Sequence, residues 1–451
     1  MDRKELIQQF KNLTEEQYVR WLLNGPDYGL AKSFIHTHTD MGSPLDAVLT
    51  ISQYIETAMD MGCDAIAITD HGTMYAVPEL HEELSAIKEG APKLLVGCEF
   101  YVCENVEDTS GKKKVRLHLC AYAKDDIGYH TIASLVTASN TRIIHVGEKS
   151  KGQDYPCISK KLLQEFLAPG TEGHGHVVLT SACVGGVLSG VQYTNKAAEK
   201  NIAALEKRLT EAETIQDHMS RIAAVTIDLE KKTEILKNGS DEEKASVQNA
   251  DTIPDLLKQA KQEIKNLQRK IDSMTKIKHC PAADFAAYIA ELSAMLRDEK
   301  ESVVSEADMA AFFEREALWY DNLAGHGNWF IELQYHGIPE EKKCMPMLVA
   351  VAQKLDLPVV AANDAHMRKK EDADLRQVIN ALRFNKWNAQ NPGDEELYLK
   401  TDKELFSWLR KAVTEEMAVK AMLGRKVLSD MCSFRLKKEE HYPEYRGEEL
   451  E

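Results

Sequence analysis

Short apolar runs alternate with helical stretches between residues 33 and 192, and this alternation restricts the fold more than any other feature of the chain. The runs are SFIHTH, AIAIT, KLLVGCEFYV, VRLHLCAY and HVVLT. Runs of this length between helices are typical of parallel strands buried by helices. WFIELQ at 329–334 and PVVAAND at 358–364 resume the pattern, with a helix expected over 340–354. The sequence therefore predicts an α/β domain that is interrupted and later completed.

The segment that interrupts the α/β domain is predicted to consist of long helices. Residues 195 to about 279 contain one proline and one glycine, and their apolar residues fall into heptads. Asn238-Gly239 marks a turn between two halves, and Pro254 suits the first turn of a second helix. We expect two long helices that fold back as an antiparallel coiled-coil hairpin. Two compact helices packed on the α/β domain are the alternative.

These textures divide the chain into five segments. Residues 1–25 are expected to be helical because their apolar residues recur at spacings near 3.6. The predicted segments are a helical leader (1–30), the first part of the α/β barrel (31–192), a helical coiled-coil insertion (193–320), the barrel completion (321–390) and a helical C-terminal segment (391–451).

Composition excludes several classes of protein. No apolar run approaches the ~18 residues that span a bilayer, and the N-terminus lacks the pattern of a signal peptide. The nine cysteines are odd in number and scattered, as expected of reduced thiols. We therefore predict a cytoplasmic protein. The net charge of −16 opposes non-specific adhesion to nucleic acid, so a polyanion must be held locally, by metal ions or by a basic patch.

Two pairs of polar residues have the spacing that places both side chains on one face of a strand. His36 and His38 are two residues apart on a predicted strand, so both imidazoles project to one face and can bind one metal ion. Surface or core histidines are the plainer interpretation. Asp364 and His366 repeat this spacing after the apolar strand PVVAA. Such a pair can hold one or two ions.

Three further strands contribute polar groups. Glu99 follows LLVGC in a run suited to complete burial, where an unpaired carboxylate would cost several kcal/mol. It requires a cation, either a metal ion or a buried arginine. His118 shares a strand face with Arg116 and Cys120. Asp70-His71 follows AIAIT at the carboxyl end of a buried strand, where α/β barrels assemble their active sites, although Asp70 is interpreted as a cap for the next helix.

The motifs, taken in order, resemble a known family. FIHTHTD, AIAITDHGTMYAVPE, LLVGCEFYV, RLHLCAY, VVLTSACVGG, WFIELQYHGIPE and PVVAANDAHM are similar to the successive motifs of a PHP (polymerase and histidinol phosphatase) domain. The version is the one at the start of bacterial DNA polymerase III alpha subunits. The resemblance covers about 33–192 and 326–400. It implies an α/β fold, a distorted (β/α)7 PHP barrel, here interrupted by the helical hairpin, with up to three metal ions at the carboxyl ends of its strands.

The resemblance also implies a ligand set. Carried over residue by residue, it comprises His36, His38, an acid of the first motif, His71, Glu99, His118, Cys183, Asp364 and His366. The first motif is one residue longer than expected, which favours Asp46 as its acid and leaves Asp40 in reserve. Cys183 stands where many PHP phosphatases have histidine, and its thiolate would favour zinc.

Mixed imidazole and carboxylate ligands suit two or three ions of Zn²⁺, Mn²⁺ or Fe²⁺. Two ions bridged by Glu99 would acidify a shared water and clamp a phosphate oxygen, so phosphate ester hydrolysis is the expected reaction. The residues expected to carry it are Glu99, His71 and Asp364. Lys113, Lys114, Arg116 and Arg368 are expected to contact the nucleic-acid backbone, although basic loops are usually solvated surface.

The leading functional hypothesis is a metal-dependent phosphoesterase with 3′–5′ exonuclease-like activity on DNA. A phosphatase for small phosphomonoesters is the second hypothesis. The third is a non-catalytic, metal-stabilised module whose coiled coil binds a replication or repair partner or a second copy of the chain. A basic stripe on the second insertion helix, within 256–279, suggests contact with nucleic acid or an acidic partner, or is simply an outer face. We identify no catalytic aspartate pair of a polymerase core, so DNA synthesis is not expected from this chain alone. A fragment of a longer protein is also possible.

Overall fold

The computed structural model describes residues 2–103, 115–141, 156–247, 253–274, 285–384 and 393–437. The chain divides into two compact units, one made of Met1–Tyr193 with Ser305–Glu451 and the other of Thr194–Val304. Among the described residues, no helix is both long enough and apolar enough to cross a bilayer.

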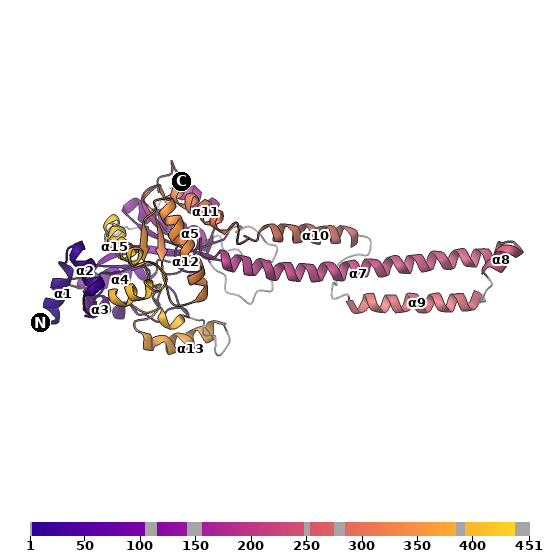
Figure 1. Cartoon of the computed structure of the whole chain (residues 1–451), viewed down its shortest axis with the longest axis horizontal. Coiled ribbons are helices and arrows are strands. Elements are labelled where there is room, and N and C mark those ends of the chain that lie inside the picture. The colour runs from indigo at the N-terminus through magenta and orange to yellow at the C-terminus, as the bar shows by residue number, and fades with distance from the viewer. Residues whose placement is uncertain are drawn as a thin grey trace, which may run out of the picture. The chain divides into compact units, whose positions relative to one another are not determined.

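The first unit contains the strands and most of the helices (Figure 1). Its strands are β1 (Ser33–Phe34), β2 (Ala65–Ile68), β3 (Lys93–Val102), β4 (Leu117–Ala123), β5 (Cys157–Ile158), β6 (Val177–Thr180), β7 (Trp329–Leu333) and β8 (Val359–Ala361). Its helices are α1 (Arg3–Lys11), α2 (Glu15–Asn24), α3 (Ile51–Met61), α4 (Ala76–Ala86), α5 (Asp126–Thr141), α6 (Lys160–Leu167), α11 (Met309–Ala324), α12 (Pro339–Lys354), α13 (Ala373–Phe384), α14 (Asp402–Leu409) and α15 (Glu415–Met431), with 3₁₀ turns at Lys370–Asp372 and Asp394–Glu396.

The strands form one curled sheet in the order β1-β2-β3-β4-β6-β7-β8, with β5 paired to β3. Strand β4 is antiparallel to β3 and β6, and the other pairs along this path are parallel. Beyond the edge strands, Thr37 forms a parallel bridge with Ala365, and the amide of His38 donates to the carbonyl of Ala365. The curl therefore brings β1 and β8 together. This mixed α/β sheet is consistent with the predicted barrel.

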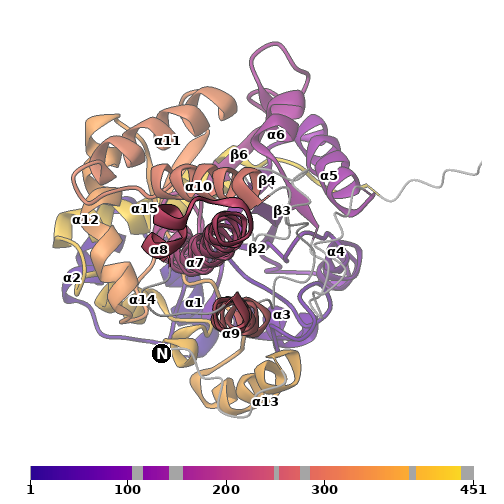
Figure 2. The same ribbon diagram turned by 90° about the vertical axis from the view of Figure 1, so that its right-hand side faces the viewer.

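Helices surround the sheet (Figure 2). The core contains apolar side chains from six strands together with Leu428 and Cys432 at the end of α15. Helix α15 lies very close to β8. A Cβ atom added to Gly424 of this helix would lie 1.9 Å from the carbonyl oxygen of Val359, closer than any real contact. A glycine is therefore required at this helix position.

A buried ion pair joins the outer helices to the start of β1. Arg425 donates to Asp402 Oδ1 at 2.6 Å, to the hydroxyl of Tyr18 at 3.0 Å and to the carbonyl of Ser33 at 2.9 Å. Tyr18 donates in turn to Asp402 at 2.6 Å. Both charged side chains are almost fully buried, so each depends on the other for its counter-charge.

Arg425→Ala is expected to lower the free energy of unfolding by about 3–5 kcal/mol, because it leaves Asp402 buried without a cation. Arg20→Ala is the matched control. It removes an exposed pair with Glu16, whose side chains are 73% and 84% exposed, and should cost less than about 1 kcal/mol. Denaturant unfolding of both variants measures the difference, and equal losses would show that the buried pair is not stabilising.

The second unit is built on one long helix. Helix α7 (Val191–Asn238) is followed by α8 (Asp241–Val247), α9 (Ile253–Met274) and α10 (Phe285–Glu301). Figure 1 shows α9 and α10 running back along α7. Leu205, Ala212 and Ile215 of α7 form a buried cluster with Ile271 and Leu292. Helix α9 covers most of the second helix expected within 256–279, and α10 follows it along the chain. Coiled-coil pairing stays a prediction.

Some helix boundaries differ from the periodicity. The helical segment expected over 1–25 consists of two helices, because Thr14 caps a new helix through its hydroxyl and Gln17 closes a capping box.

Candidate metal centre

The predicted ligands come from the ends of neighbouring strands. His36 and His38 follow β1, His71 follows β2, Cys183 follows β6, and Asp364 and His366 follow β8. His118 begins the antiparallel strand β4, which places it opposite Tyr101 near the carboxyl end of β3. These positions therefore share one edge of the sheet.

Glu99, on β3, lies at the centre of the cluster and is fully buried. Its Oε1 lies 3.2 Å from His36 Nε2 and 3.1 Å from His118 Nδ1, and its Oε2 lies 2.7 Å from His71 Nδ1 and 3.5 Å from His38 Nε2. The ion-pair partners of this carboxylate are thus imidazoles, not the buried arginine considered as an alternative.

One group of donors surrounds a point between β1 and β8. The Nε2 atoms of His36 and His38 are 3.1 Å apart, and Asp364 Oδ1 lies 3.2 Å and 3.0 Å from them. A second group lies on the other side of Glu99, where the Sγ of Cys183 is 3.5 Å from His118 Nδ1. The donor atoms of His36, His38 and Asp364 in the first group, and those of Glu99, His71 and His118 in the second, lie close enough together to hold one ion each, and Cys183 flanks the second set.

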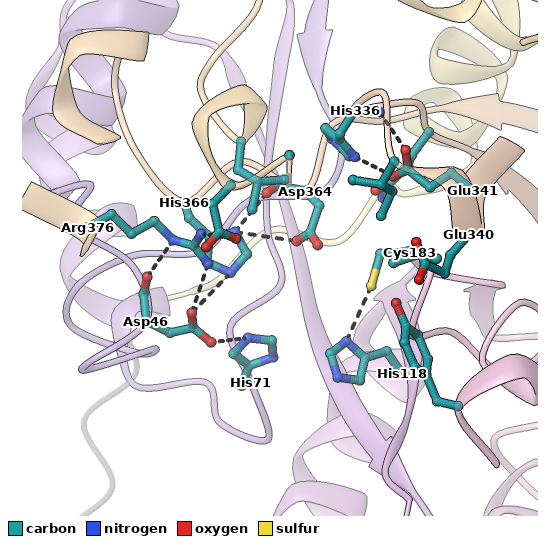
Figure 3. A pocket seen from close by; sticks show the side chains of 18 residues that line it. Asp46, His71, His118, Cys183, His336, Glu340, Glu341, Asp364, His366 and Arg376 are labelled. Atoms are coloured by element: carbon teal, nitrogen blue, oxygen red, sulfur yellow. Dashed lines mark hydrogen bonds and ion pairs between the residues drawn. The ribbon is translucent and has the colours of Figure 1, made fainter. Parts of the chain in front are cut away.

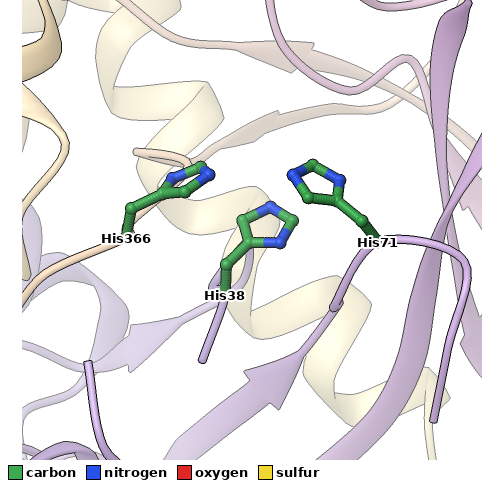
Figure 4. Close-up of side chains that lie close together, drawn as sticks. All are labelled: His38, His71 and His366. Atoms are coloured by element: carbon green, nitrogen blue, oxygen red, sulfur yellow. The ribbon is translucent and has the colours of Figure 1, made fainter. Parts of the chain in front are cut away.

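Asp46, the favoured acid of the first motif, lies beside two histidines. Its Oδ2 is 3.3 Å from His71 Nε2, and its Oδ1 is 3.9 Å from His366 Nε2. Figure 4 shows the rings of His71 and His366 flanking that of His38. The ring centroids lie 4.1 Å and 4.3 Å from that of His38. Asp40 is exposed, so the structure brings Asp46, and not Asp40, to the cluster.

The cluster opens into a cavity of about 480 Å³. Figure 3 shows Asp46, His71, His118, Cys183, Asp364 and His366 around it.

Three buried atoms of the cluster, His71 Nδ1, Glu99 Oε2 and Asp364 Oδ1, make ion-pair contacts with one another or with neighbouring imidazoles but no hydrogen bond of good geometry among the described residues. Buried polar atoms are normally paired, so groups left without a bond need an explanation. Nitrogen, oxygen and sulfur donors converge here, which is the donor set that Zn²⁺, Mn²⁺ or Fe²⁺ accepts. The residues present therefore fit divalent metal ions.

Comparison with known proteins agrees with this arrangement. The family model described as the PHP domain matches residues 35–225. A PHP domain thus lies at residues 35–225. The match confirms the resemblance for the motifs from FIHTHTD to VVLTSACVGG, whereas WFIELQYHGIPE and PVVAANDAHM lie beyond it.

Proteins named DNA polymerase III subunit alpha are similar to this chain. The one from Treponema pallidum is 23% identical over 384 residues, covering 83% of this chain and 21% of the relative. The one from Campylobacter jejuni is 29% identical over 168 residues, 37% of this chain and 12% of the relative. The one from Deinococcus radiodurans is 49% identical over 65 residues, 14% of this chain and 5% of the relative. The chain thus spans about a fifth or less of the length of these relatives.

Electrostatics keep the acids of the PHP centre ionised. Burial opposes ionisation of Glu99, but His118, His36 and His71 outweigh it and hold the pKa of this carboxyl well below its usual range. Burial likewise opposes protonation of His71, but Glu99 and Asp46 raise its pKa to about 10. The charges in the cluster are thus strongly coupled.

The backbone is strained where it presents ligands. Leu45, Ala182 and Asp364 have positive φ angles of 62°, 55° and 48°. The first two precede Asp46 and Cys183, and the third is itself a candidate ligand. Non-glycine residues in this region cost about 1–3 kcal/mol each, so the surrounding structure must hold them.

Asp70 does not cap the next helix, so that interpretation was wrong. Its carboxylate accepts from the Thr39 amide at 2.7 Å, from the Thr39 hydroxyl at 2.8 Å and from the Ser43 hydroxyl at 2.8 Å. It therefore fixes the loop that follows His38. The reason is that α4 begins only at Ala76, beyond the reach of an Asp70 cap.

The structure describes two of the four basic residues that were predicted to contact the nucleic-acid backbone. Lys113 and Lys114 lie outside the described residues. Arg116 is exposed, with its guanidinium 6.0 Å from the ring centroid of Tyr101. Arg368 pairs with Glu56 of α3 at 3.3 Å and is not among the residues that line the cavity. The structure therefore brings neither described arginine into the cavity.

Several residues of the site were missed in the sequence. Arg376 and Arg383 of α13 pair with Asp46. Glu332 of β7 lies 2.7 Å from His36 Nδ1 and also accepts from Thr180 and Gln334. It holds His36 with Nε2 toward Glu99 and Asp364. The sequence does indicate Glu332, because an acid within the apolar run WFIEL needs a cation for the same reason as Glu99.

Glu332→Gln is expected to weaken divalent-metal binding by about 10–100-fold, because one amide oxygen replaces two acceptor oxygens that receive three donors. Glu314→Gln, which removes an exposed pair with Lys354, is the control and should bind metal like the wild type. Titration calorimetry with Mn²⁺ measures both, and an unchanged affinity in Glu332→Gln would remove its role in orienting His36.

Proposed function

We propose that this PHP protein is a metal-dependent phosphoesterase that hydrolyses DNA phosphodiesters from the 3′ end. The proposal is supported above all by one observation. Three carboxylates, five imidazoles and a thiol converge at one edge of the sheet, next to a cavity, with their donor atoms close enough together to hold metal ions. The residues proposed to carry the reaction are Glu99, His71 and Asp364.

Divalent ions held by these side chains would polarise a phosphoryl oxygen and acidify water. The chain itself contributes the geometry. Glu99 contacts both donor groups through its two oxygens, which makes it the proposed link between two ions, and Asp364 completes the group with His36 and His38. Two or three ions are proposed, held by His36, His38, Asp46, His71, Glu99, His118, Cys183, Asp364 and His366.

The shape of the cavity supports a strand end as substrate. A volume of about 480 Å³ lies in the range of small-ligand sites and suits a terminal nucleotide. Arg116, close to His118 on the same chain segment, is proposed to contact the DNA backbone, as are Lys113, Lys114 and Arg368. The names of the relatives, subunits of a DNA polymerase, also favour DNA over a small phosphomonoester.

A 5′-labelled single-stranded oligonucleotide tests the proposal. With Mn²⁺ or Zn²⁺, the wild type should shorten it progressively from the 3′ end, and Glu99→Gln should leave it intact. Asp40→Asn, which alters an exposed acid outside the cluster, should act like the wild type. No hydrolysis of any phosphodiester by the metal-loaded wild type would overturn the proposal.

Two alternatives predict other outcomes of the same experiment. Hydrolysis of p-nitrophenyl phosphate without cleavage of DNA would assign a phosphomonoesterase. Loss of folding on chelation with no turnover of any ester would assign a metal-stabilised module that binds a replication or repair partner. The helical insertion is proposed as its contact surface or as a homodimer interface, and light scattering of a variant lacking 195–279 tests the latter.

A further inference from the structure

A histidine and a glutamate on the cavity wall have no part in the ligand set. His336 follows β7, and Glu341 lies in the first turn of α12. Glu341 Oε1 lies 2.6 Å from His336 Nδ1, and its Oε2 accepts the backbone amide of His336 at 2.6 Å (Figure 3). Their side chains are 5% and 4% exposed. Both carboxylate oxygens are thus used by one residue, which makes Glu341 a poor candidate for a metal ligand.

The other ring nitrogen of His336 points to the strand that carries Asp364. His336 Nε2 lies 3.1 Å from the carbonyl oxygen of Asn363. Since a carbonyl only accepts, Nε2 donates this bond. The contact joins the loop after β7 to the turn after β8, two segments that are adjacent only because their strands pair.

This turn is the place where the backbone needs support. Asp364 has a φ of +48°, in the left-handed region that costs a non-glycine residue about 1–3 kcal/mol. The side-chain amide of Asn363 donates to the carbonyls of Glu396 at 3.0 Å and Tyr398 at 2.7 Å. The turn is therefore held on one side by the 396–398 backbone and on the other by His336.

We infer that His336 and Glu341 are positioning residues that hold the Asn363-Asp364 turn, so that the Asp364 carboxylate reaches His36 and His38. Glu341 fixes the ring of His336, the ring fixes the carbonyl of Asn363, and the next residue presents Oδ1 3.0 Å from His38 Nε2. The inference rests on the metal-binding part of the proposed function and is independent of its substrate.

Metal affinity is the direct readout, with Mn²⁺ alone as the probe. Glu341→Gln and His336→Gln should each weaken Mn²⁺ binding by about 10–100-fold in titration calorimetry, as expected when a partner outside the ligand set is lost. The matched control is His326→Gln, which disrupts a histidine–aspartate pair of 3.0 Å outside the cavity, with the His326 side chain 67% exposed. It should bind Mn²⁺ like the wild type.

A double-mutant cycle separates positioning from general loss of structure. If the pair acts through Asp364, Glu341→Gln should weaken binding in the wild type but cause no further loss in Asp364→Ala. The absorption spectrum of the Co²⁺-loaded protein should change in Glu341→Gln as it does in Asp364→Ala, because both displace the same carboxylate. Glu341→Gln is nearly isosteric and serves if His336→Gln fails to fold.

Two results would overturn the inference. One is wild-type Mn²⁺ affinity in a folded Glu341→Gln protein. The other is an equal loss of affinity in the presence and absence of the Asp364 carboxylate. Hydrolysis assays do not enter this comparison, so failure of the nuclease proposal alone would leave the result readable. A wild-type protein that binds no divalent ion would overturn both.

Discussion

Glu99→Gln is expected to reduce the rate of phosphodiester hydrolysis by about 10²–10³-fold or more, the loss that follows removal of one electrostatic stabiliser from an active site. Glu99 is the one carboxylate that contacts four imidazoles of the cluster, through two oxygens. The amide keeps the shape of the side chain but removes its charge. The donor groups on both sides of Glu99 should therefore lose ion affinity together.

The control for this prediction is Asp40→Asn, which removes one acid of the same motif region at an exposed position. The comparison uses kcat/KM on a 3′-ended strand with Mn²⁺ at saturating concentration. Equal activity of Glu99→Gln and wild type would contradict the assignment of Glu99, whereas equal activity of Asp40→Asn and wild type is expected.

Metal removal is expected to destabilise the first unit markedly. An ion that binds only the folded state adds about 2.7 kcal/mol of stability at a concentration of 100 Kd and about 4.1 kcal/mol at 1,000 Kd. Without it, Glu99, Asp364 and Asp46 stay buried with only histidines and the arginines of α13 as counter-charges. Chelation should therefore lower the melting temperature, and Mn²⁺ should restore it.

The chelation experiment has an internal control. In Asp364→Ala the difference in melting temperature between the chelated and the Mn²⁺-loaded protein should be smaller than in the wild type. In Arg20→Ala this difference should equal that of the wild type, because Arg20 lies on α2 in an exposed pair. A melting temperature that does not respond to chelator or Mn²⁺ in the wild type would show that the cluster is stable as a set of ion pairs.

Most of the candidate site could be predicted from the chain because strand geometry is local. The spacing of two between His36 and His38 places both rings on one side of the backbone, and the two Nε2 atoms are 3.1 Å apart. Glu99 was predictable from burial alone, since an acid in an apolar run needs a cation. The full ligand set was implied by the resemblance to a PHP domain. The α/β alternation alone predicts parallel strands, and His118 reaches this edge only because β4 is antiparallel.

The remaining site residues depend on contacts between distant segments. Arg376 of α13 contacts Asp46 although it lies 330 residues further along the chain, and no local spacing indicates that pair. His336 and Glu341 are five residues apart, across the loop that leads into α12, so neither strand nor helix periodicity links them. Helix α9 ends at Met274, within the range of 256–279 predicted for the second insertion helix, and residues 275–279 lie outside the described residues.

Crystals grown with Mn²⁺ and measured for anomalous scattering show whether this cluster binds metal ions. Peaks are expected within coordination distance of Glu99 and of donors on both sides of it, with His36, His38 and Asp364 around one peak. No peak at this edge of the sheet, with Glu99 still paired to its four histidines, would contradict the proposed metal centre.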